Sequence, residues 1–194
     1  KKYSTGKVRE NFNDIKIKSN NEFRSNYLII NQMEKDSAIF PINPYEWVKN
    51  TINNIREITN DKIIIREHPL QKKYNPQKIE KIIIENNFNN CFVSSNEDIY
   101  DDLKDTFFCI TFSSGSAVEA IIADVPVYTE DNRSCAYEIS SHALDYKKIL
   151  SDNDKLNFLS ALSNTHWSLR EITEGICWNF FKEHFKYKSN TFLN

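Results

Sequence analysis

The sequence has very few glycines, one methionine and no long apolar run. Only 3 of its 194 residues are Gly and only 1 is Met. No apolar run approaches the roughly 20 residues that a membrane-spanning helix needs, so the sequence predicts no transmembrane segment. Lys and Arg number 25 against 27 Asp and Glu, which gives a net charge of -2. Because no global basic field is present, we expect no nucleic-acid partner.

Cysteine and histidine occur without the spacing of a metal site. The 4 cysteines are widely separated, no Cys-x-x-Cys motif is present, and no His stands beside them at metal-ligand spacing. They are Cys91, Cys109, Cys135 and Cys177. Such a pattern is typical of buried, reduced thiols, so we expect free cysteines in a cytoplasmic protein. The 4 histidines show no matching spacing either, and no metal cofactor is expected.

Short apolar runs alternate with helical patterns along the chain. The runs predict strands near residues 27–31, 62–67, 91–94, 108–112 and 125–128. They are apolar throughout rather than at every second residue, as strands are in a parallel sheet covered on both faces. The sequence therefore predicts an α/β fold, with a Rossmann-like parallel sheet and helices on both faces.

Helix starts are marked by caps and prolines. Asn43-Pro44 and Asn75-Pro76 each place a capping Asn before a proline at the first helical position. A capping box at Ser168 and Glu171 predicts one further helix that packs Trp178 and Phe181 against the domain. We expect one domain over residues 27–185, with a tail or the remnant of a preceding domain at 1–26 and a second tail at 186–194.

Four small polar residues, Ser113–Ser116, separate a predicted strand from a predicted helix. Hydroxyls and free N–H groups at such a turn suit an anion, and Gly115 allows close backbone approach. Ser116 with Glu119 also forms a capping box, so the turn could simply satisfy the start of the helix. A serine hydrolase is disfavoured because the first Gly of the Gly-x-Ser-x-Gly motif is missing.

Arg66-Glu67-His68-Pro69 follows another buried strand. Alternation along a strand would point Arg66 and His68 to the same side, where a guanidinium and an imidazole suit a diphosphate. Pro69 favours an extended backbone at His68. The alternative is that Arg66 pairs with a local carboxylate and that His68 is an ordinary loop residue.

These motifs together resemble a known family. "IIIREHP" followed by "CITFSSGSAVEAIIADVPVYTED" is similar to the C-terminal, nucleotide-sugar-binding half of GT-B glycosyltransferases. The most similar group makes capsule and lipopolysaccharide and includes the Kdo and polysialic acid transferases, with a His-Pro motif and a serine pair. The segments "NQMEKDS", "SSHALDY" and "THWSLREITEGICW" extend the resemblance over residues 27–181.

The resemblance implies a GT-B C-terminal fold and the transfer of a sugar from a nucleotide-sugar donor to a surface glycan acceptor, at a cytoplasmic or inner-membrane-peripheral location. It assigns donor phosphates to His68, Ser113, Ser114 and Ser116, and the ribose or base to Glu119. Gln32, Asp36 and Arg66 would line the same cleft. No residue is assigned as the catalytic base, and a second domain or chain would complete the cleft. A sugar-nucleotide epimerase and a non-catalytic nucleotide-sugar-binding module remain open as alternatives.

Overall fold

A computed structural model describes residues 24–184 of the chain. The described residues divide into two compact units, the first ending at Lys155 and the second beginning at Leu156. Each unit is described by itself. The predicted tails lie almost wholly outside the described residues, and the predicted domain limits stay a prediction.

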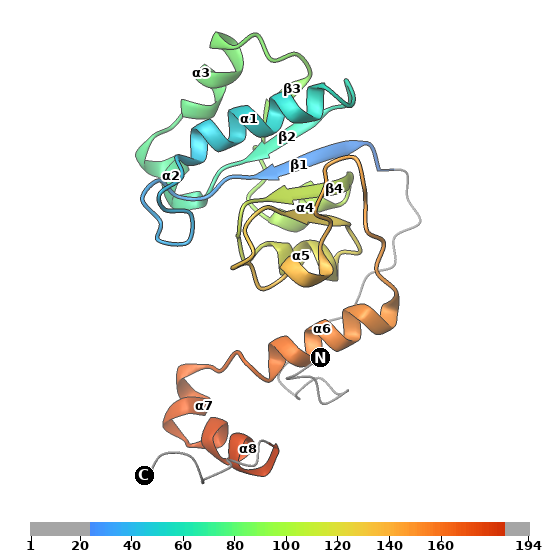
Figure 1. The fold of residues 1–194 in the computed structure, drawn as a ribbon. Coiled ribbons are helices and arrows are strands. Elements are labelled where there is room, and N and C mark those ends of the chain that lie inside the picture. Colours follow the sequence, from blue (N-terminus) through green and yellow to red (C-terminus); the bar gives the residue numbers. More distant parts are fainter. Residues whose placement is uncertain (1–23, 185–194) are drawn as a thin grey trace, which may run out of the picture. The chain divides into compact units, whose positions relative to one another are not determined.

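The first unit contains one sheet of five strands in the order β3-β2-β1-β4-β5 (Figure 1). Every neighbouring pair is parallel. The strands are β1 (Asn26–Ile30), β2 (Ile63–Arg66), β3 (Cys91–Val93), β4 (Thr106–Thr111) and β5 (Val127–Thr129). This confirms the predicted α/β, Rossmann-like parallel sheet, with strand limits that differ from the predicted ones by a few residues.

Alternate strand residues supply two buried layers. On one face Tyr27, Ile29 and Phe108 form a hydrophobic cluster with α1 (Pro44–Arg56) and with Ile79 of α3 (Lys78–Glu85). On the other face Leu28 and Cys109 are fully buried but do not belong to that cluster. There α4 (Ile99–Leu103) and α5 (Ala117–Ile122) contact β4. The sheet is therefore covered on both faces, as the uniformly apolar strands predicted.

Helix starts follow the predicted chemistry at some positions and not at others. The Asn43 side chain caps α1 as expected, accepting from the N–H of Tyr45. The second predicted start is wrong, because α3 begins at Lys78 after a left-handed Gln77 with a φ of 70° and not at Pro76. A short helix α2 (Pro69–Tyr74), which the sequence reading missed, occupies the intervening chain.

The described part of the second unit begins within α6 (Asp152–Ser163). The predicted single C-terminal helix is two helices, α7 (Leu169–Thr173) and α8 (Ile176–His184). Gly175 separates them with a φ of 74°, a conformation that a residue with a side chain adopts only with strain. Trp167 contacts Phe180 and Phe181 in this unit, whereas Trp178 is 62 % exposed. The predicted packing of Trp178 and Phe181 on the sheet domain stays a prediction.

The cysteines are all free, as expected. Cys91 and Cys109 are buried, but Cys135 is exposed and Cys177 is half-buried, which corrects the expectation that all are buried. No helix within residues 24–184 combines the length and the apolar character needed to cross a bilayer.

Candidate functional site

The loops after β1, β4 and β5 are joined at the point where the strand order reverses. In open parallel sheets this crevice at the carboxyl ends of the strands is where ligands bind. Gln32, which is 5 % exposed, accepts hydrogen bonds from the Ser113 N–H at 2.9 Å and from its hydroxyl at 3.3 Å. The Ala38 carbonyl accepts from Ser113 Oγ at 3.0 Å and from the Arg133 guanidinium at 3.3 Å. The structure therefore brings Gln32 and Ser113 into direct contact.

The serine turn is held mainly by its own polar groups. Ser114 N–H donates to Thr111 Oγ1 at 3.0 Å, and the Ser114 hydroxyl accepts from the Ser116 N–H at 3.2 Å. Ser116 makes no side-chain capping bond, so the predicted Ser116–Glu119 capping box is wrong and Ser114 supplies the cap. Within the described residues the Gly115 N–H has no protein acceptor, and the space above its Cα is open. The turn therefore presents one backbone donor outward.

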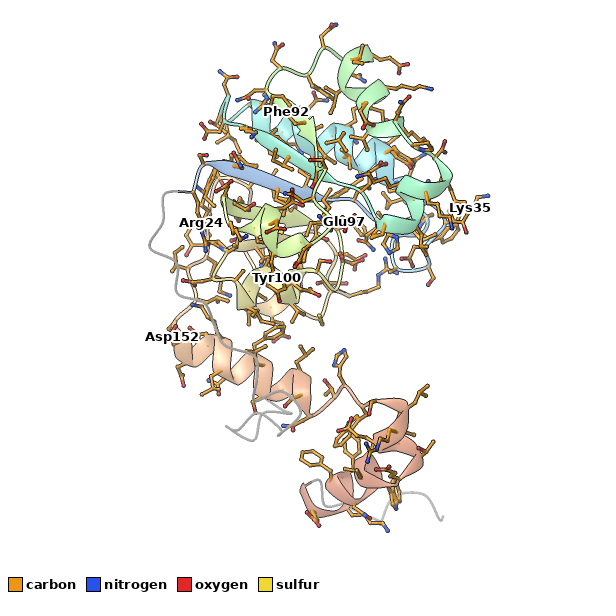
Figure 2. All side chains as sticks on the ribbon, turned by 180° about the vertical axis from the view of Figure 1, so that it is seen from behind. Arg24, Lys35, Phe92, Glu97, Tyr100 and Asp152 are labelled. Atoms are coloured by element: carbon orange, nitrogen blue, oxygen red, sulfur yellow. The ribbon has the colours of Figure 1, made fainter. Side chains whose placement is uncertain are left out.

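Glu119 lies in the first turn of α5, directly after the serine turn. Its Oε2 is buried and has no hydrogen-bond partner within the described residues. Burial raises the pKa of Tyr100 in α4, and the Glu119 charge is the second cause of that rise. Figure 2 labels Tyr100, which belongs to α4, so the Glu119 carboxylate acts on a residue of that helix.

His68 is half-buried at the end of β2 and caps α2. Its Nδ1 accepts from the Leu70 N–H at 3.3 Å, which leaves Nε2 as the protonated nitrogen of the neutral ring. Its ψ of 134° is the extended conformation that Pro69 was expected to impose. His68 is therefore both a capping residue and a potential donor through Nε2.

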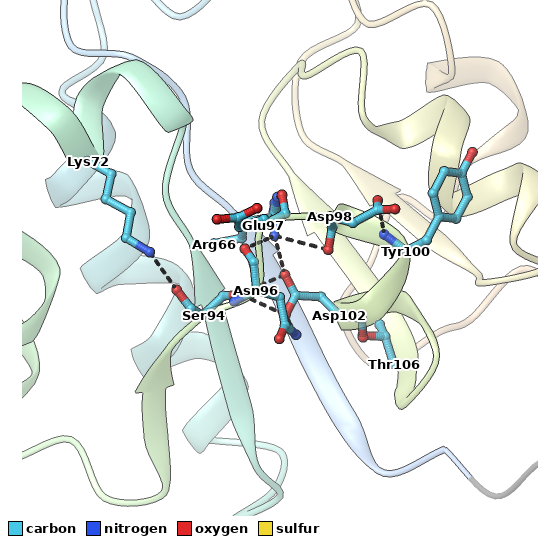
Figure 3. A network of polar contacts seen from close by, with 9 residues as sticks. All are labelled: Arg66, Lys72, Ser94, Asn96, Glu97, Asp98, Tyr100, Asp102 and Thr106. Atoms are coloured by element: carbon cyan, nitrogen blue, oxygen red, sulfur yellow. Dashed lines mark hydrogen bonds and ion pairs between the residues drawn. The ribbon is translucent and has the colours of Figure 1, made fainter.

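Arg66 is engaged with the loop between β3 and α4 (Figure 3). Its guanidinium pairs with Asp102 Oδ2 at 2.6 Å and donates to the carbonyls of Asn96 at 3.0 Å and Glu97 at 2.5 Å. Only 12 % of the Arg66 side chain is exposed. These contacts match the alternative in which Arg66 pairs with a local carboxylate, and its role as a phosphate ligand stays a prediction.

Carboxylates of the crevice loops already accept hydrogen bonds from the protein. Asp36 Oδ1 accepts from the Ala38 N–H at 2.9 Å and so shapes the loop after β1. Glu130 Oε2 accepts from Trp47 Nε1 at 2.6 Å, and Asp131 pairs with Arg133 at 2.5 Å. None of these three stands out as a catalytic base among the described residues.

Glu67 differs from them because it is buried without a partner. Its side chain is 6 % exposed, and its Oε1 has no hydrogen bond within the described residues. Burial first, and the Glu80 carboxylate second, raise the pKa of Glu67 to about 7, against the opposite effect of Lys72 and Lys78. Burial and Glu67 likewise raise the pKa of Tyr45 to about 12.

A hollow of about 380 Å³ lies at the carboxyl ends of β2 and β3. Its lining includes Glu67, Lys72 and Asn96. The Asp102 network of Figure 3 forms the wall on the β3 side, because Ser94 Oγ and Asn96 Nδ2 donate to Asp102 at 2.7 and 2.8 Å. The hollow is at β2 and β3, whereas the serine turn follows β4, so β1 lies between them in the sheet. His68, which follows β2, is on the side of the hollow.

Sequence reasoning missed two parts of this edge. Asp102 carried no signal, because an acid in a short helix resembles any solvent-exposed acid. The contact between Trp47 and Glu130 carried no signal either, because the two residues lie 83 positions apart. No group of three or more His, Cys, Asp or Glu side chains suited to a metal occurs within the described part of the chain.

Comparisons with known proteins found similar folds but no similar sequence. No family model matches the chain, and no curated protein matches it significantly. Two solved structures of KpsC from Thermosulfurimonas dismutans are similar. The beta Kdo 2,7 transferase has 17 % identity and a TM-score of 0.45, covering 74 % of this chain and 46 % of that one. The beta Kdo 2,4 transferase has 15 % identity and a TM-score of 0.47, covering 75 % and 47 %.

A third similar structure is the C-terminal domain of the glycosyl transferase group 1 family protein LpcC from Francisella tularensis. It has 10 % identity and a TM-score of 0.42, covering 86 % of this chain and 88 % of that one. The chain thus spans about half the length of the two KpsC structures, at 46 % and 47 %. Two of the three structures are named as Kdo transferases and the third as a glycosyl transferase.

Proposed function

We propose that the sheet unit binds the nucleotide of a sugar-nucleotide donor and is the donor-binding domain of a glycosyltransferase acting in the cytoplasm. One observation carries the proposal: the buried, unpartnered Glu119 Oε2 follows directly on the serine turn at the switch point. A buried acceptor without a donor is costly, and the hydroxyls of a ribose would satisfy it. The motif resemblance supports the same assignment.

The phosphates would be held by neutral donors. Within the described residues His68 Nε2 and the Gly115 N–H have no protein acceptor, and the Ser116 hydroxyl makes no capping bond. Such donors would stabilise the charge that develops on the leaving nucleotide as the glycosidic bond breaks. In this proposal Gln32, Asp36 and Arg66 shape the crevice, and no metal takes part.

The proposal assigns no carboxylate of the crevice loops as the catalytic base. Asp36, Glu130 and Asp131 each accept a hydrogen bond from the protein. This observation favours a second reading, in which the domain binds a nucleotide sugar and a second domain or chain supplies the base and the glycan acceptor site. An epimerase would differ from both by turning over its sugar nucleotide without an acceptor.

Thermal shift with CMP-, UDP-, GDP- and dTDP-sugars tests donor binding. A ligand present at 100 times its Kd adds about 2.7 kcal/mol of stability, which such an assay resolves. A panel that leaves the melting temperature unchanged with every donor would refute the proposal.

Two variants then test the assigned residues by calorimetric titration of the best donor. His68→Asn keeps a capping side chain but removes the Nε2 donor, and Glu119→Gln removes the charged acceptor. Each should weaken binding by roughly tenfold or more, because a hydrogen bond to a charged group contributes about 1.5–3 kcal/mol. Glu85→Gln, on the exposed end of α3, is the control and should bind as the natural protein does. Unchanged affinity in both variants would exclude these residues from the site.

A further inference from the structure

A separate hollow of about 380 Å³ lies beside α1, between that helix, the loop after β1 and Glu130. Its lining combines amide, carboxylate, hydroxyl and apolar side chains. The lining residues are Pro41, Ile42, Asn43, Glu46, Trp47, Asn50, Thr51, Asn54 and Glu130. None of them belongs to the residues assigned above to the donor.

The polar side chains of the hollow are available to a ligand. Asn50 and Asn54 lie one helical turn apart and so face the same side of α1. Both are exposed, as is Glu46. Within the described residues no hydrogen bond is found to the side chain of any of these three.

The far wall of the hollow is held in place by the protein. Trp47 Nε1 donates to Glu130 Oε2 at 2.6 Å, which fixes the carboxylate at the edge of the hollow. The Trp47 ring packs edge-on against Phe112, with the ring centroids 6.1 Å apart. Phe112 directly precedes Ser113, so the hollow adjoins the crevice at the switch point.

The charge of the lining limits what can bind. It contains two carboxylates, Glu46 and Glu130, and no Lys, Arg or His. A phosphate or a ligand carboxylate would be repelled and would find no cation. The nucleotide of the proposed donor is therefore a poor fit for this hollow.

Amide groups define the ligand class further. Each Asn side chain carries both donors and an acceptor, and a sugar hydroxyl is likewise both donor and acceptor. A purely cationic ligand would leave the amide donors of Asn50 and Asn54 unmatched. Pro41 and Ile42 add an apolar wall that suits the C–H face of a pyranose ring, and the volume lies within the range of small-molecule sites.

We propose that this hollow binds a neutral saccharide through Asn50, Asn54 and Glu46, with Glu130 as the residue nearest the donor crevice. That the saccharide is the glycan acceptor rests on the proposed function, whereas its binding does not. The hollow would then present a sugar hydroxyl beside the donor without help from a cationic side chain.

Titration by NMR tests the proposal with the full ¹⁵N-labelled chain. The probes are the methyl glycosides of glucose, galactose and N-acetylglucosamine. At least one should shift the Trp47 indole N–H resonance and saturate in the millimolar range. Trp167 and Trp178, the other two of the 3 tryptophans, serve as internal references and should not shift.

Matched variants locate the binding. Replacing both Asn50 and Asn54 by Ala should weaken the affinity roughly tenfold, because two neutral hydrogen bonds are lost. Asn53→Ala is the control, since Asn53 is exposed on the same helix but does not line the hollow. Equal weakening by Asn53→Ala would overturn the assignment.

The remaining outcomes separate this inference from the proposed function. A Trp47 shift with CMP or spermidine but with none of the glycosides would overturn the saccharide assignment, and so would no shift at all. Saccharide binding without any donor binding would leave the inference standing and refute the proposed donor. Donor binding without saccharide binding would support the proposed donor and refute the saccharide inference.

Discussion

Two buried carboxylates, Glu67 just after β2 and Asp102 in α4, have nearly equal burial and opposite surroundings. Asp102 is 7 % exposed and Glu67 is 6 % exposed. Asp102 accepts from Arg66, Ser94 and Asn96. Glu67 has an Oε1 without a partner and faces Glu80, whose Oε2 is also buried without one, within the described residues.

The difference shows that burial alone does not fix what a carboxylate does. Asp102 accepts hydrogen bonds from three side chains, and these bonds connect the β3–α4 loop to Arg66 at the end of β2. Glu67 lacks such partners, so it gains a proton near neutral pH instead. Arg66 and Glu67 are adjacent in the sequence, yet one serves the satisfied network and the other belongs to the unsatisfied cluster. The first region is structural, and the second responds to pH.

The largest expected effect comes from breaking the satisfied network. Asp102→Ala should lower the free energy of unfolding by about 3–5 kcal/mol, because it leaves the buried Arg66 charge without its partner. Urea denaturation at pH 7 measures the loss. Asp101→Ala is the control, since Asp101 is exposed and pairs with Lys104 at the surface. Equal losses in the two variants would mean that the network holds nothing together.

Glu67→Gln should remove a pH dependence of stability. Folding raises the Glu67 pKa from its ordinary 4.5 to about 7, so the folded state binds the proton more tightly. Stability from this group is therefore greatest below pH 4.5 and declines as the pH rises to about 7. The full loss is about 3–4 kcal/mol, at about 1.4 kcal/mol for each pKa unit between 4.5 and about 7. The groups that face Glu67 are Glu80, Lys72, Lys78 and Tyr45.

Urea denaturation at pH 5 and pH 8 measures the effect as a difference between the natural protein and Glu67→Gln. The natural protein should lose more stability over this range than the variant, because glutamine does not titrate there. Glu85→Gln corrects for the loss of one exposed carboxylate. A variant with the same pH dependence as the natural protein would show that Glu67 is ionised and satisfied.

Much of the fold was predictable because it depends on local chemistry. Apolar runs gave the five parallel strands, and Asn43 with Pro44 gave the start of α1. The start of α3 was not predictable, since a left-handed Gln77 replaces the expected Asn-Pro start. The break at Gly175 carried a signal, a glycine inside a helical pattern, which the capping box at Ser168 outweighed.

The site was less predictable than the fold because its contacts join distant segments. The family resemblance assigned Gln32 and Ser113 to one cleft, and the structure shows them in contact across 81 positions. No spacing rule indicates that Arg66 reaches Asp102 or that Trp47 reaches Glu130. The partner of a polar side chain depends on which loops the topology brings together. The sequence therefore identified candidate residues but not the contacts that they make.

The smallest expected effect concerns two hydroxyls of the serine turn, one with a hydrogen-bond partner and one without a capping bond. Ser114 Oγ accepts from the Ser116 N–H, whereas Ser116 makes no side-chain capping bond. Ser114→Ala should therefore cost about 1 kcal/mol of stability, the usual value of a helix cap. Ser116→Ala should stay within about 0.5 kcal/mol of the natural protein. The capping box expected from the sequence had placed the cap at Ser116 instead.

Denaturant melts of the two variants without ligand decide between these two capping assignments. Calorimetric titration with a donor then tests whether either serine binds the ligand. If Ser116→Ala weakens donor binding while its unliganded stability is unchanged, then the Ser116 hydroxyl donates a hydrogen bond to the bound ligand. If Ser116→Ala proves the less stable of the two, the capping assignment made from the structure is wrong.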